Sequence, residues 1–179
     1  LDVPAGLTLA VMVDAKALLG CGLAPAAAVD ALFPPRDSSR VEWVRIAAHL
    51  GEIERCRPLA ARLRELGYRV GLNMMQAAGK PAGRITALAR EVASWDAVAV
   101  LYFADSFGSM DGAEVARVVD ALAAGWNGAI GIHTHNNKSL AVQNTLAAIA
   151  HGVSFLDATV TGMGRGAGNA ELEILLCEL

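Results

Sequence analysis

The segment GAIGIHTHNN (residues 128–137) decides between the folds that this chain could adopt. Successive residues of a β-strand point to opposite sides, so the two isoleucines share one face while Gly131, His133 and His135 share the other. A central strand of an open doubly wound sheet should be apolar on both sides, because helices cover both of its faces. Small residues that give way to polar ones at the carboxyl end instead favour the interior of a (β/α)8 barrel, which opens there into a site.

The remainder of the chain repeats one unit, a short apolar run followed by an amphipathic segment. The runs typical of strands lie at 7–13, 41–48, 68–75, 97–104, 128–133 and 153–160, and the segments typical of helices lie at 24–33, 52–67, 81–95, 111–125, 139–152 and from about Ala170. This alternation predicts a parallel sheet with right-handed crossovers. Arg45 and Asn73 place polar groups on the inward faces of two further strands. We therefore expect an α/β fold of the TIM-barrel type.

Composition excludes several classes of function. The 179 residues suit one globular domain, 54% of them are hydrophobic, and the formal net charge is −3. That charge gives no reason to expect a nucleic acid or an anionic membrane as partner, and no apolar stretch reaches the roughly 20 residues of a membrane span. Cys21, Cys56 and Cys177 are far apart and in no metal-binding spacing, so we expect reduced, buried thiols in a cytoplasmic protein.

The two histidines have the spacing of a metal site. Residues i and i+2 of a strand carry Cβ atoms roughly 6–7 Å apart on one face. Both imidazoles of His133 and His135 could then bind one divalent ion, at about 2.0–2.2 Å per bond. Two hydrogen-bonded core histidines would produce the same pattern, so the spacing alone leaves both interpretations open. One of the following residues, Asn136 or Asn137, is expected to cap the next helix.

Longer motifs resemble those of the metal-dependent aldolase, lyase and synthase superfamily, whose members are TIM barrels. GIHTHNNKSLAVQNTLAAIAHG contains the H-x-H-N that follows strand seven of those barrels, and LDATVTGMGRGAGNAELE contains the G-x-G-x-x-A-G-N-A-x-x-E that follows strand eight. LYFADSFGSM is similar to the D-S-x-G element after strand six, and VRIAAH and VGLNMMQ are similar to strands four and five. The resemblance covers essentially the whole chain. It is greatest to the 4-hydroxy-2-oxovalerate aldolase branch, and the superfamily also includes hydroxymethylglutaryl-CoA lyase and isopropylmalate synthase.

The resemblance implies a divalent cation held by His133, His135 and an aspartate of the first strand. Such a cation chelates a 2-oxo acid such as pyruvate and stabilises its enolate. Mn²⁺ or Mg²⁺ is the expected metal, with Co²⁺ or Zn²⁺ as alternatives. Arg45 and Asp105 are candidate catalytic residues, although an ion pair and a turn would equally account for them. The substrate-binding candidates are His49, Asn73, Ser106, Asn136, Arg165 and Asn169.

One element of the family is missing. The first strand should carry an arginine–aspartate pair, and no T-L-R-D-G-like stretch occurs in this sequence. Counting back from the H-x-H strand makes residues 7–13 strand three, so residues 1–179 are expected to form a single partial barrel of strands three to eight. A whole barrel needs about 250 residues. We expect a fragment of a longer protein or a truncated relative, with open sheet edges that favour a homo-oligomer or pairing with another chain.

The expected activity is that of a divalent-metal-dependent aldolase or lyase, which makes or cleaves a carbon–carbon bond next to a 2-oxo acid. Its partners would be a small 2-oxo acid and an aldehyde. Two alternatives stay open: an acyl-CoA-dependent synthase of the isopropylmalate synthase type, and a catalytically incomplete or non-enzymatic relative that needs a partner segment. A Schiff-base aldolase requires a lysine at a strand end. None of the three lysines, Lys16, Lys80 and Lys138, lies in a predicted strand.

Overall fold

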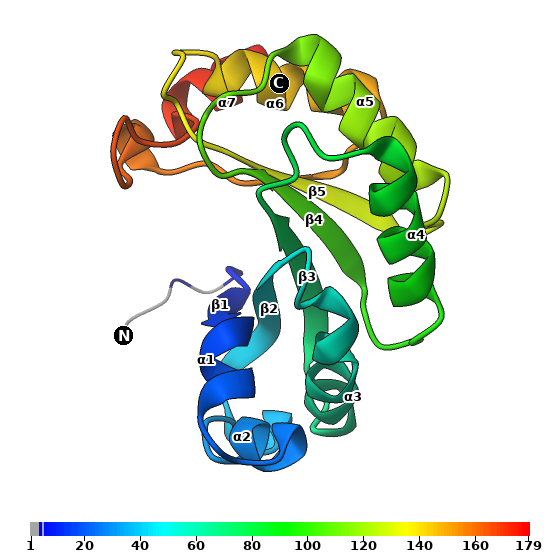
Figure 1. Ribbon diagram of the computed structural model, residues 1–179. Helices are drawn as coiled ribbons and strands as arrows, with labels where there is room; N and C mark the ends of the chain where they lie inside the picture. Colours follow the sequence, from blue (N-terminus) through cyan, green and yellow to red (C-terminus); the bar gives the residue numbers. More distant parts are fainter. Residues whose placement is uncertain (1–3, 5) are drawn as a thin grey trace.

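Six parallel strands form one curved sheet, and they neighbour one another in the order of the chain (Figure 1). In the computed structural model, which describes residue 4 and residues 6–179, the strands are β1 (Leu9–Asp14), β2 (Val41–His49), β3 (Arg69–Met75), β4 (Val100–Asp105), β5 (Ala129–Thr134) and β6 (Phe155–Leu156). Every neighbouring pair is parallel. The strands and their intervening helices form a half-barrel, which confirms the predicted partial (β/α)8 fold.

The helices cover the outer, convex face of the sheet (Figure 1). They are α1 (Ala15–Gly20), α2 (Pro25–Asp30), α3 (Arg57–Glu65), α4 (Ala82–Ala93), α5 (Gly112–Ala123), α6 (Ala141–Ala150) and α7 (Leu172–Glu178), with 3-10 turns η1 (Arg36–Ser38), η2 (Ile53–Cys56) and η3 (Val160–Gly162). Helix α1 was not predicted. It follows β1 without a loop because the Asp14 side chain accepts a hydrogen bond from the Ala17 backbone nitrogen and caps the helix.

The last strand is shorter than the predicted 153–160. Its pairing with β5 ends when the Asp157 nitrogen donates to the Ile132 carbonyl oxygen. From Thr159 onward the chain turns away, and the Thr159 nitrogen donates to the Ala170 carbonyl oxygen instead. The residues after β6 therefore form a loop and do not extend the strand.

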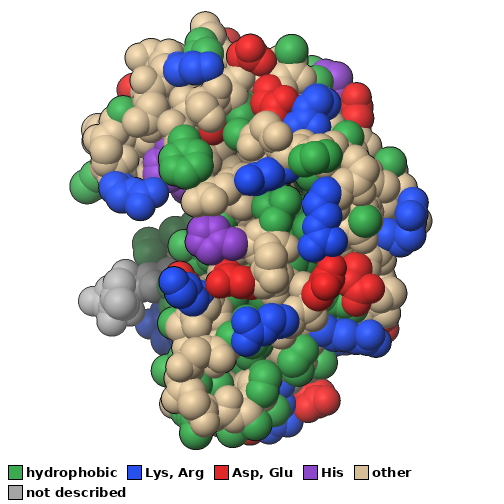
Figure 2. Space-filling view, in the orientation of Figure 1, with side chains coloured by type: hydrophobic (Ala, Val, Ile, Leu, Met, Phe, Trp, Pro, Cys, Tyr) green, Lys and Arg blue, Asp and Glu red, His purple; other side chains and the backbone are tan. Residues whose placement is uncertain are grey.

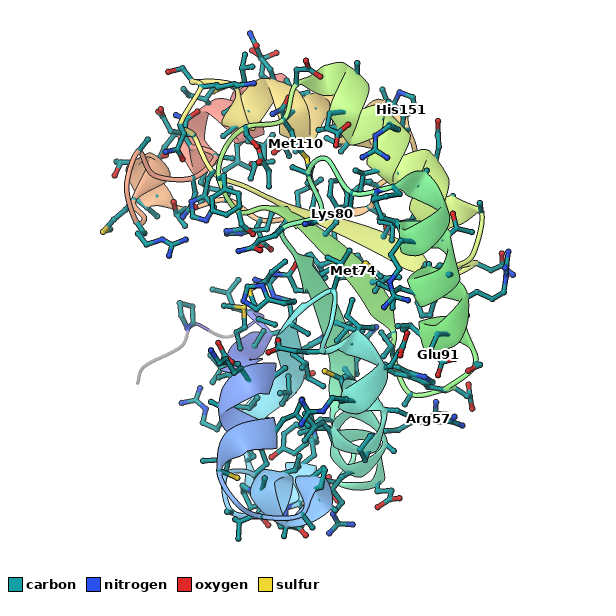
Figure 3. The ribbon with its side chains drawn as sticks, viewed as in Figure 1. Arg57, Met74, Lys80, Glu91, Met110 and His151 are labelled. Atoms are coloured by element: carbon teal, nitrogen blue, oxygen red, sulfur yellow. The ribbon has the colours of Figure 1, made fainter. Side chains whose placement is uncertain are left out.

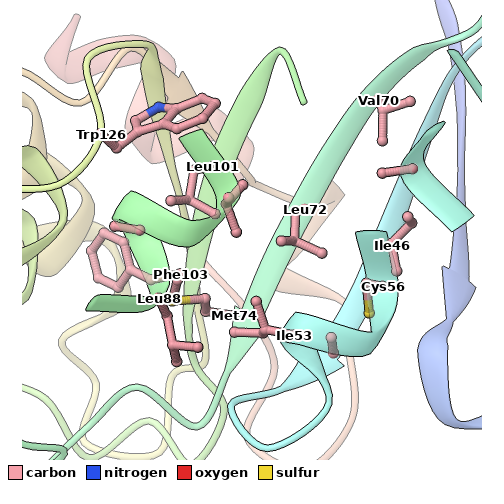
Figure 4. Packing of buried hydrophobic residues seen from close by; sticks show 14 of the residues in the cluster. Ile46, Ile53, Cys56, Val70, Leu72, Met74, Leu88, Leu101, Phe103 and Trp126 are labelled. Carbon is pink, nitrogen blue, oxygen red and sulfur yellow. The ribbon is translucent and has the colours of Figure 1, made fainter. Parts of the chain in front are cut away.

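The hydrophobic core lies between the sheet and the outer helices, and Figure 4 shows part of it. Ile46, Leu72 and Phe103 project from three neighbouring strands and are fully buried against helical side chains such as Leu88. Cys56 is buried at this interface, but Cys21 and Cys177 are exposed. The prediction of three buried thiols is therefore wrong for two of them: Cys21 directly follows the end of α1, and Cys177 lies in the last helix, α7.

Among the residues that the structure describes, no helix is both long enough and apolar enough to cross a bilayer.

Candidate functional site

His133 and His135 lie together at the carboxyl end of β5. Their ring centroids are 5.0 Å apart, and the ring planes are nearly perpendicular at 83°. His135 follows the strand and forms an isolated antiparallel bridge with Asn169, which joins the end of β5 to the glycine-rich loop after β6. Burial is the main cause that lowers the pKa of His135, followed by the neighbouring His133. A lowered pKa favours a neutral imidazole, the form that binds metals.

Asp157, a residue that the sequence analysis did not select, contacts the first histidine. The Oδ2 atom of Asp157 lies 2.9 Å from Nδ1 of His133. Arg45 of β2 also contacts this carboxylate: its Nη1 donates to Oδ1 at 2.8 Å, and its Nη2 lies 2.7 Å from Oδ2. Arg45 and Asp157 are 112 positions apart in the sequence; Arg45 lies in β2 and Asp157 directly follows β6, and these two strands are not neighbours in the sheet. The curvature of the sheet therefore brings them together. Burial raises the pKa of Asp157, but the bonds from His133 and Arg45 outweigh it, so the net pKa is lowered.

Tyr102 of β4 completes this inward-facing cluster. The Arg45 guanidinium lies over the Tyr102 ring, 4.5 Å from its centroid. The ring occupies the space beside Gly131, where any Cβ atom would overlap it. Burial and the charge of Asp157 raise the pKa of Tyr102, so the phenol stays protonated. The glycine before the histidine pair is thus explained by the aromatic ring of the adjacent strand.

The glycine-rich loop presents Asn169 to the same region. Asn169 is buried, its Nδ2 donates to the Met163 carbonyl oxygen, and its Oδ1 has no hydrogen-bond partner among the described residues. Side chains cannot replace the loop glycines freely, because a Cβ at Gly164 would overlap the Asn169 amide and one at Gly168 would overlap the Gly162 carbonyl. A cavity of about 320 Å³ is lined by Arg45, His133, Leu156, Asp157, Ala158, Thr159 and Asn169.

Three predicted site residues have structural partners. Both carboxylate oxygens of the fully buried Asp105 accept backbone hydrogen bonds, from Ser109 and Met110. The Ser106 hydroxyl accepts from the Gln76 backbone nitrogen, and Asn136 Oδ1 accepts from the nitrogen of the first residue of α6. For Asp105 and Asn136 these contacts are the turn and cap roles that the sequence had left open.

Three other candidates line the strand ends or the loop. His49 is the last residue of β2 and alternates onto the same face as Arg45, where it is half-buried. Asn73 is buried on β3 beside Tyr102 in the register of the sheet, and its Oδ1 has no partner among the described residues. Arg165 is exposed on the glycine-rich loop.

Asp157 and Tyr102 were not predicted as site residues, and the sequence contains an indication for only one of them. Asp157 is a charged residue inside a predicted strand, and a charge in such a place needs a partner. Tyr102 had no comparable signal, because its importance depends on the register between β4 and β5. The fourth histidine, His151, follows α6 and lies 3.7 Å from Asp120 of α5, and Figure 3 shows it on the helical, outer side of the molecule.

These residues fit a divalent cation as part of its ligand set. Two imidazoles and an unpartnered amide oxygen are suitable donors. Asp157, by contrast, uses both carboxylate oxygens on Arg45 and His133. Within the described part of the chain, no group of three or more His, Cys, Asp or Glu side chains could hold a metal ion. Figure 2 shows histidine side chains along the hollow on the open side of the half-barrel.

The chain is similar in sequence to known enzymes. The chain is 38% identical over 136 residues to a 4-hydroxy-2-oxovalerate aldolase of Bacillus thuringiensis (strain Al Hakam), a match that covers 76% of this chain and 40% of that protein. It is 33% identical over 149 residues to an oxaloacetate decarboxylase of Mycobacterium tuberculosis, covering 78% and 41% respectively. The chain thus spans about 40% of the length of the curated relatives that it matches.

The chain also resembles a solved structure and matches the sequence pattern of a family. The crystal structure of the HMG-CoA lyase from Brucella melitensis has a TM-score of 0.77 and 16% identity, and the match covers 99% of this chain and 67% of that one, so the two share a fold. The sequence pattern of the HMGL-like family matches residues 41–179, from the start of β2 through α7. On this match over most of its length, the chain belongs to the HMGL-like family.

Proposed function

We propose that this chain carries the cation-binding part of a metal-dependent enzyme that makes or cleaves a carbon–carbon bond next to a 2-oxo acid. The observation that carries the proposal is the pair of imidazoles, 5.0 Å apart, beside the buried and unpartnered Oδ1 of Asn169. A buried polar atom without a partner is costly, so a ligand for it is expected. The relationship to 4-hydroxy-2-oxovalerate aldolase supports the choice of reaction.

His133, His135 and Asn169 are the residues that would hold the cation, with Mn²⁺ or Mg²⁺ as the first candidates. A bound divalent cation supplies a Lewis acid that polarises the carbonyl of the 2-oxo acid. The neutral imidazole favoured at His135 by burial suits this role, since a protonated ring has no lone pair to donate.

Substrate recognition is assigned to side chains that are not already engaged. Arg45 uses its guanidinium on Asp157, so we propose that it shapes the site rather than binding substrate. Arg165 is exposed on the loop beside His135 and is the candidate partner for the substrate carboxylate. Asn73, with its unpartnered Oδ1, is the candidate hydrogen-bonding group within the barrel.

We propose that the site needs a further carboxylate ligand, supplied by a segment that pairs with the open edges of the sheet. The edges are β1 and β6. The segment would come from a longer protein or from another chain. The chain alone should therefore bind a cation weakly, because its described residues offer two imidazoles and an amide oxygen but no free carboxylate at the site.

Titration with Mn²⁺, followed by the electron paramagnetic resonance signal of the free ion, tests the metal site. The variant His135→Ala should lower Mn²⁺ affinity by about 10-fold or more, since it removes a ligand. His151→Ala is the matched control, because this histidine lies outside the site and should leave the affinity unchanged. Equal affinity of the wild type and His135→Ala would contradict the proposal.

Pyruvate release from 4-hydroxy-2-oxo acids then tests the reaction, in a protein that also contains the strands closing the barrel. We expect release to depend on added Mn²⁺ and to be lost in His135→Ala. A second candidate, decarboxylation of oxaloacetate, is favoured by the similarity to the Mycobacterium tuberculosis enzyme. Supplying oxaloacetate in place of the 4-hydroxy-2-oxo acid separates the two reactions. Decarboxylation of oxaloacetate releases CO₂, whereas cleavage of the 4-hydroxy-2-oxo acid releases an aldehyde.

A further inference from the structure

The carboxylate of Asp157 is enclosed by donors on two sides. Oδ1 accepts from Nη1 of Arg45 at 2.8 Å, whereas Oδ2 lies 2.7 Å from Nη2 of Arg45 and 2.9 Å from Nδ1 of His133. The two parallel contacts to the guanidinium define the plane of the carboxylate. The side chains of Arg45 and Asp157 are each only 22% exposed, so water competes little for these bonds.

This arrangement determines where the proton between Asp157 and His133 lies. The guanidinium of Arg45 is always charged and only donates, so the paired carboxylate is ionised and only accepts. The hydrogen between Oδ2 and Nδ1 must then belong to the imidazole. In a neutral ring whose Nδ1 carries the hydrogen, Nε2 holds the free lone pair.

Arg45 also keeps Asp157 from turning toward the cavity. Its guanidinium rests on the Tyr102 ring, which in turn fills the space left by Gly131. Turning the carboxylate toward a cation would break both bonds to Arg45 and leave that charge unpaired in the interior, which is costly. The carboxylate that contacts His133 is thereby withheld from direct metal binding.

We propose that Asp157 is a positioning residue: locked by Arg45, it holds His133 in the Nδ1–H tautomer and so presents Nε2 to the cation. The part of this inference that concerns the cation rests on the proposed function, whereas the tautomer does not. Asp157 touches neither substrate nor metal in this role and acts only through His133.

Nitrogen-15 NMR of the imidazole rings tests the tautomer without any metal, at about pH 8, which lies above the pKa of about 6.5 for histidine in model peptides. The His133 signals are assigned by their loss in His133→Gln. We expect His133 of the wild type as the Nδ1–H tautomer, and a mixture of tautomers in Asp157→Asn, where an amide replaces the carboxylate. The control is Asp120→Asn, which alters the aspartate 3.7 Å from His151 and should leave His133 unchanged.

The same variants are then titrated with Mn²⁺. Asp157→Asn should weaken binding by about 10-fold, as expected when the hydrogen-bond partner of a metal-binding histidine is lost, and Asp120→Asn should not. An Nε2–H tautomer of His133 in the wild type would overturn the proposal, as would an Asp157→Asn variant with unchanged tautomer and affinity. If Asp157→Asn fails to fold, the wild-type spectrum still decides. If the tautomer is as expected but the wild type binds no Mn²⁺, only the proposed function fails.

Discussion

Strands β4 and β1 are both apolar, yet they are buried to different extents. All six residues of β4 are buried, whereas β1 alternates between half-buried and exposed residues, and Met12 is 58% exposed. β4 has a neighbour on each side, while β1 is the edge of the sheet and has one. The burial of these two hydrophobic strands therefore depends on how many strands lie beside them as well as on their composition.

The difference is greatest on the inner face of the half-barrel. A cavity of about 360 Å³ is lined on one side by Thr8, Ala10, Val11 and Met12 and on the other by Trp43, Arg45, Gly71, Tyr102, Phe155 and Asp157. Around β4 the inner groups pack against one another, with Tyr102 contacting Arg45 and Phe155. The site thus lies on the well-packed side of the cavity, and the open side is where a closing segment would bind.

The largest expected effect comes from removing a core side chain of β4. Phe103→Ala, at a fully buried position, should lower the free energy of unfolding by about 3–5 kcal/mol. Met12→Ala in β1 should change it by less than about 0.5 kcal/mol, because this side chain is already largely in water. Urea denaturation followed by circular dichroism measures both. Equal losses of unfolding free energy in the two variants would contradict the difference in burial between β4 and β1.

The ion pair across the interior should come next. Arg45→Met leaves Asp157 without its charged partner and should cost about 2–3 kcal/mol, less than a fully buried pair because both side chains are 22% exposed. The control is Arg64→Met, which removes a pair whose side chains are 56% and 94% exposed and should have no measurable effect. The same denaturation experiment applies, and a stable Arg45→Met would show that the pair does not order the inner face.

A smaller effect is expected from adding a methyl group at a crowded position between two strands. Gly131→Ala places a methyl group against the Tyr102 ring and should destabilise the fold by about 1–2 kcal/mol through overpacking. Gly20→Ala, in the last position of α1, meets no atom within 4 Å and should be neutral or stabilising by about 0.4–1 kcal/mol. Thermal unfolding of both variants measures the contrast. A neutral Gly131→Ala would mean that the ring can move away.

Cysteine labelling tests the contrast between buried and exposed regions without changing any residue. Burial, followed by the charge of Glu52, raises the pKa of Cys56 to about 12, so at about pH 8 this thiol stays protonated and shielded. Cys21 and Cys177 are exposed. A thiol reagent should therefore label two cysteines in the folded protein and the third only in denaturant, as counted by mass spectrometry. Labelling of all three at one rate would contradict the tight packing around η2.

Much of the fold could be predicted because its signals are local. Alternation of apolar and amphipathic runs predicted the order of strands and helices, apart from α1, and the i, i+2 spacing predicted that the two histidines would lie together. The length of β6 could not be predicted, since the hydrogen bond from Thr159 goes to Ala170 in a later segment. The exposure of Cys21, just after α1, likewise depends on which distant segments pack against it, and a short sequence window does not contain them.

The sequence by itself determined the strand–helix rhythm, the family motifs and the side of β5 on which His133 and His135 project, because each of these follows from residues close together in the chain. Only the tertiary structure decided that Arg45 pairs with Asp157, that Tyr102 supports this pair, and that Asp105 closes a loop. The physical reason is the curvature of the sheet, which brings inward-facing side chains from distant strands within hydrogen-bonding distance, at separations of up to 112 residues.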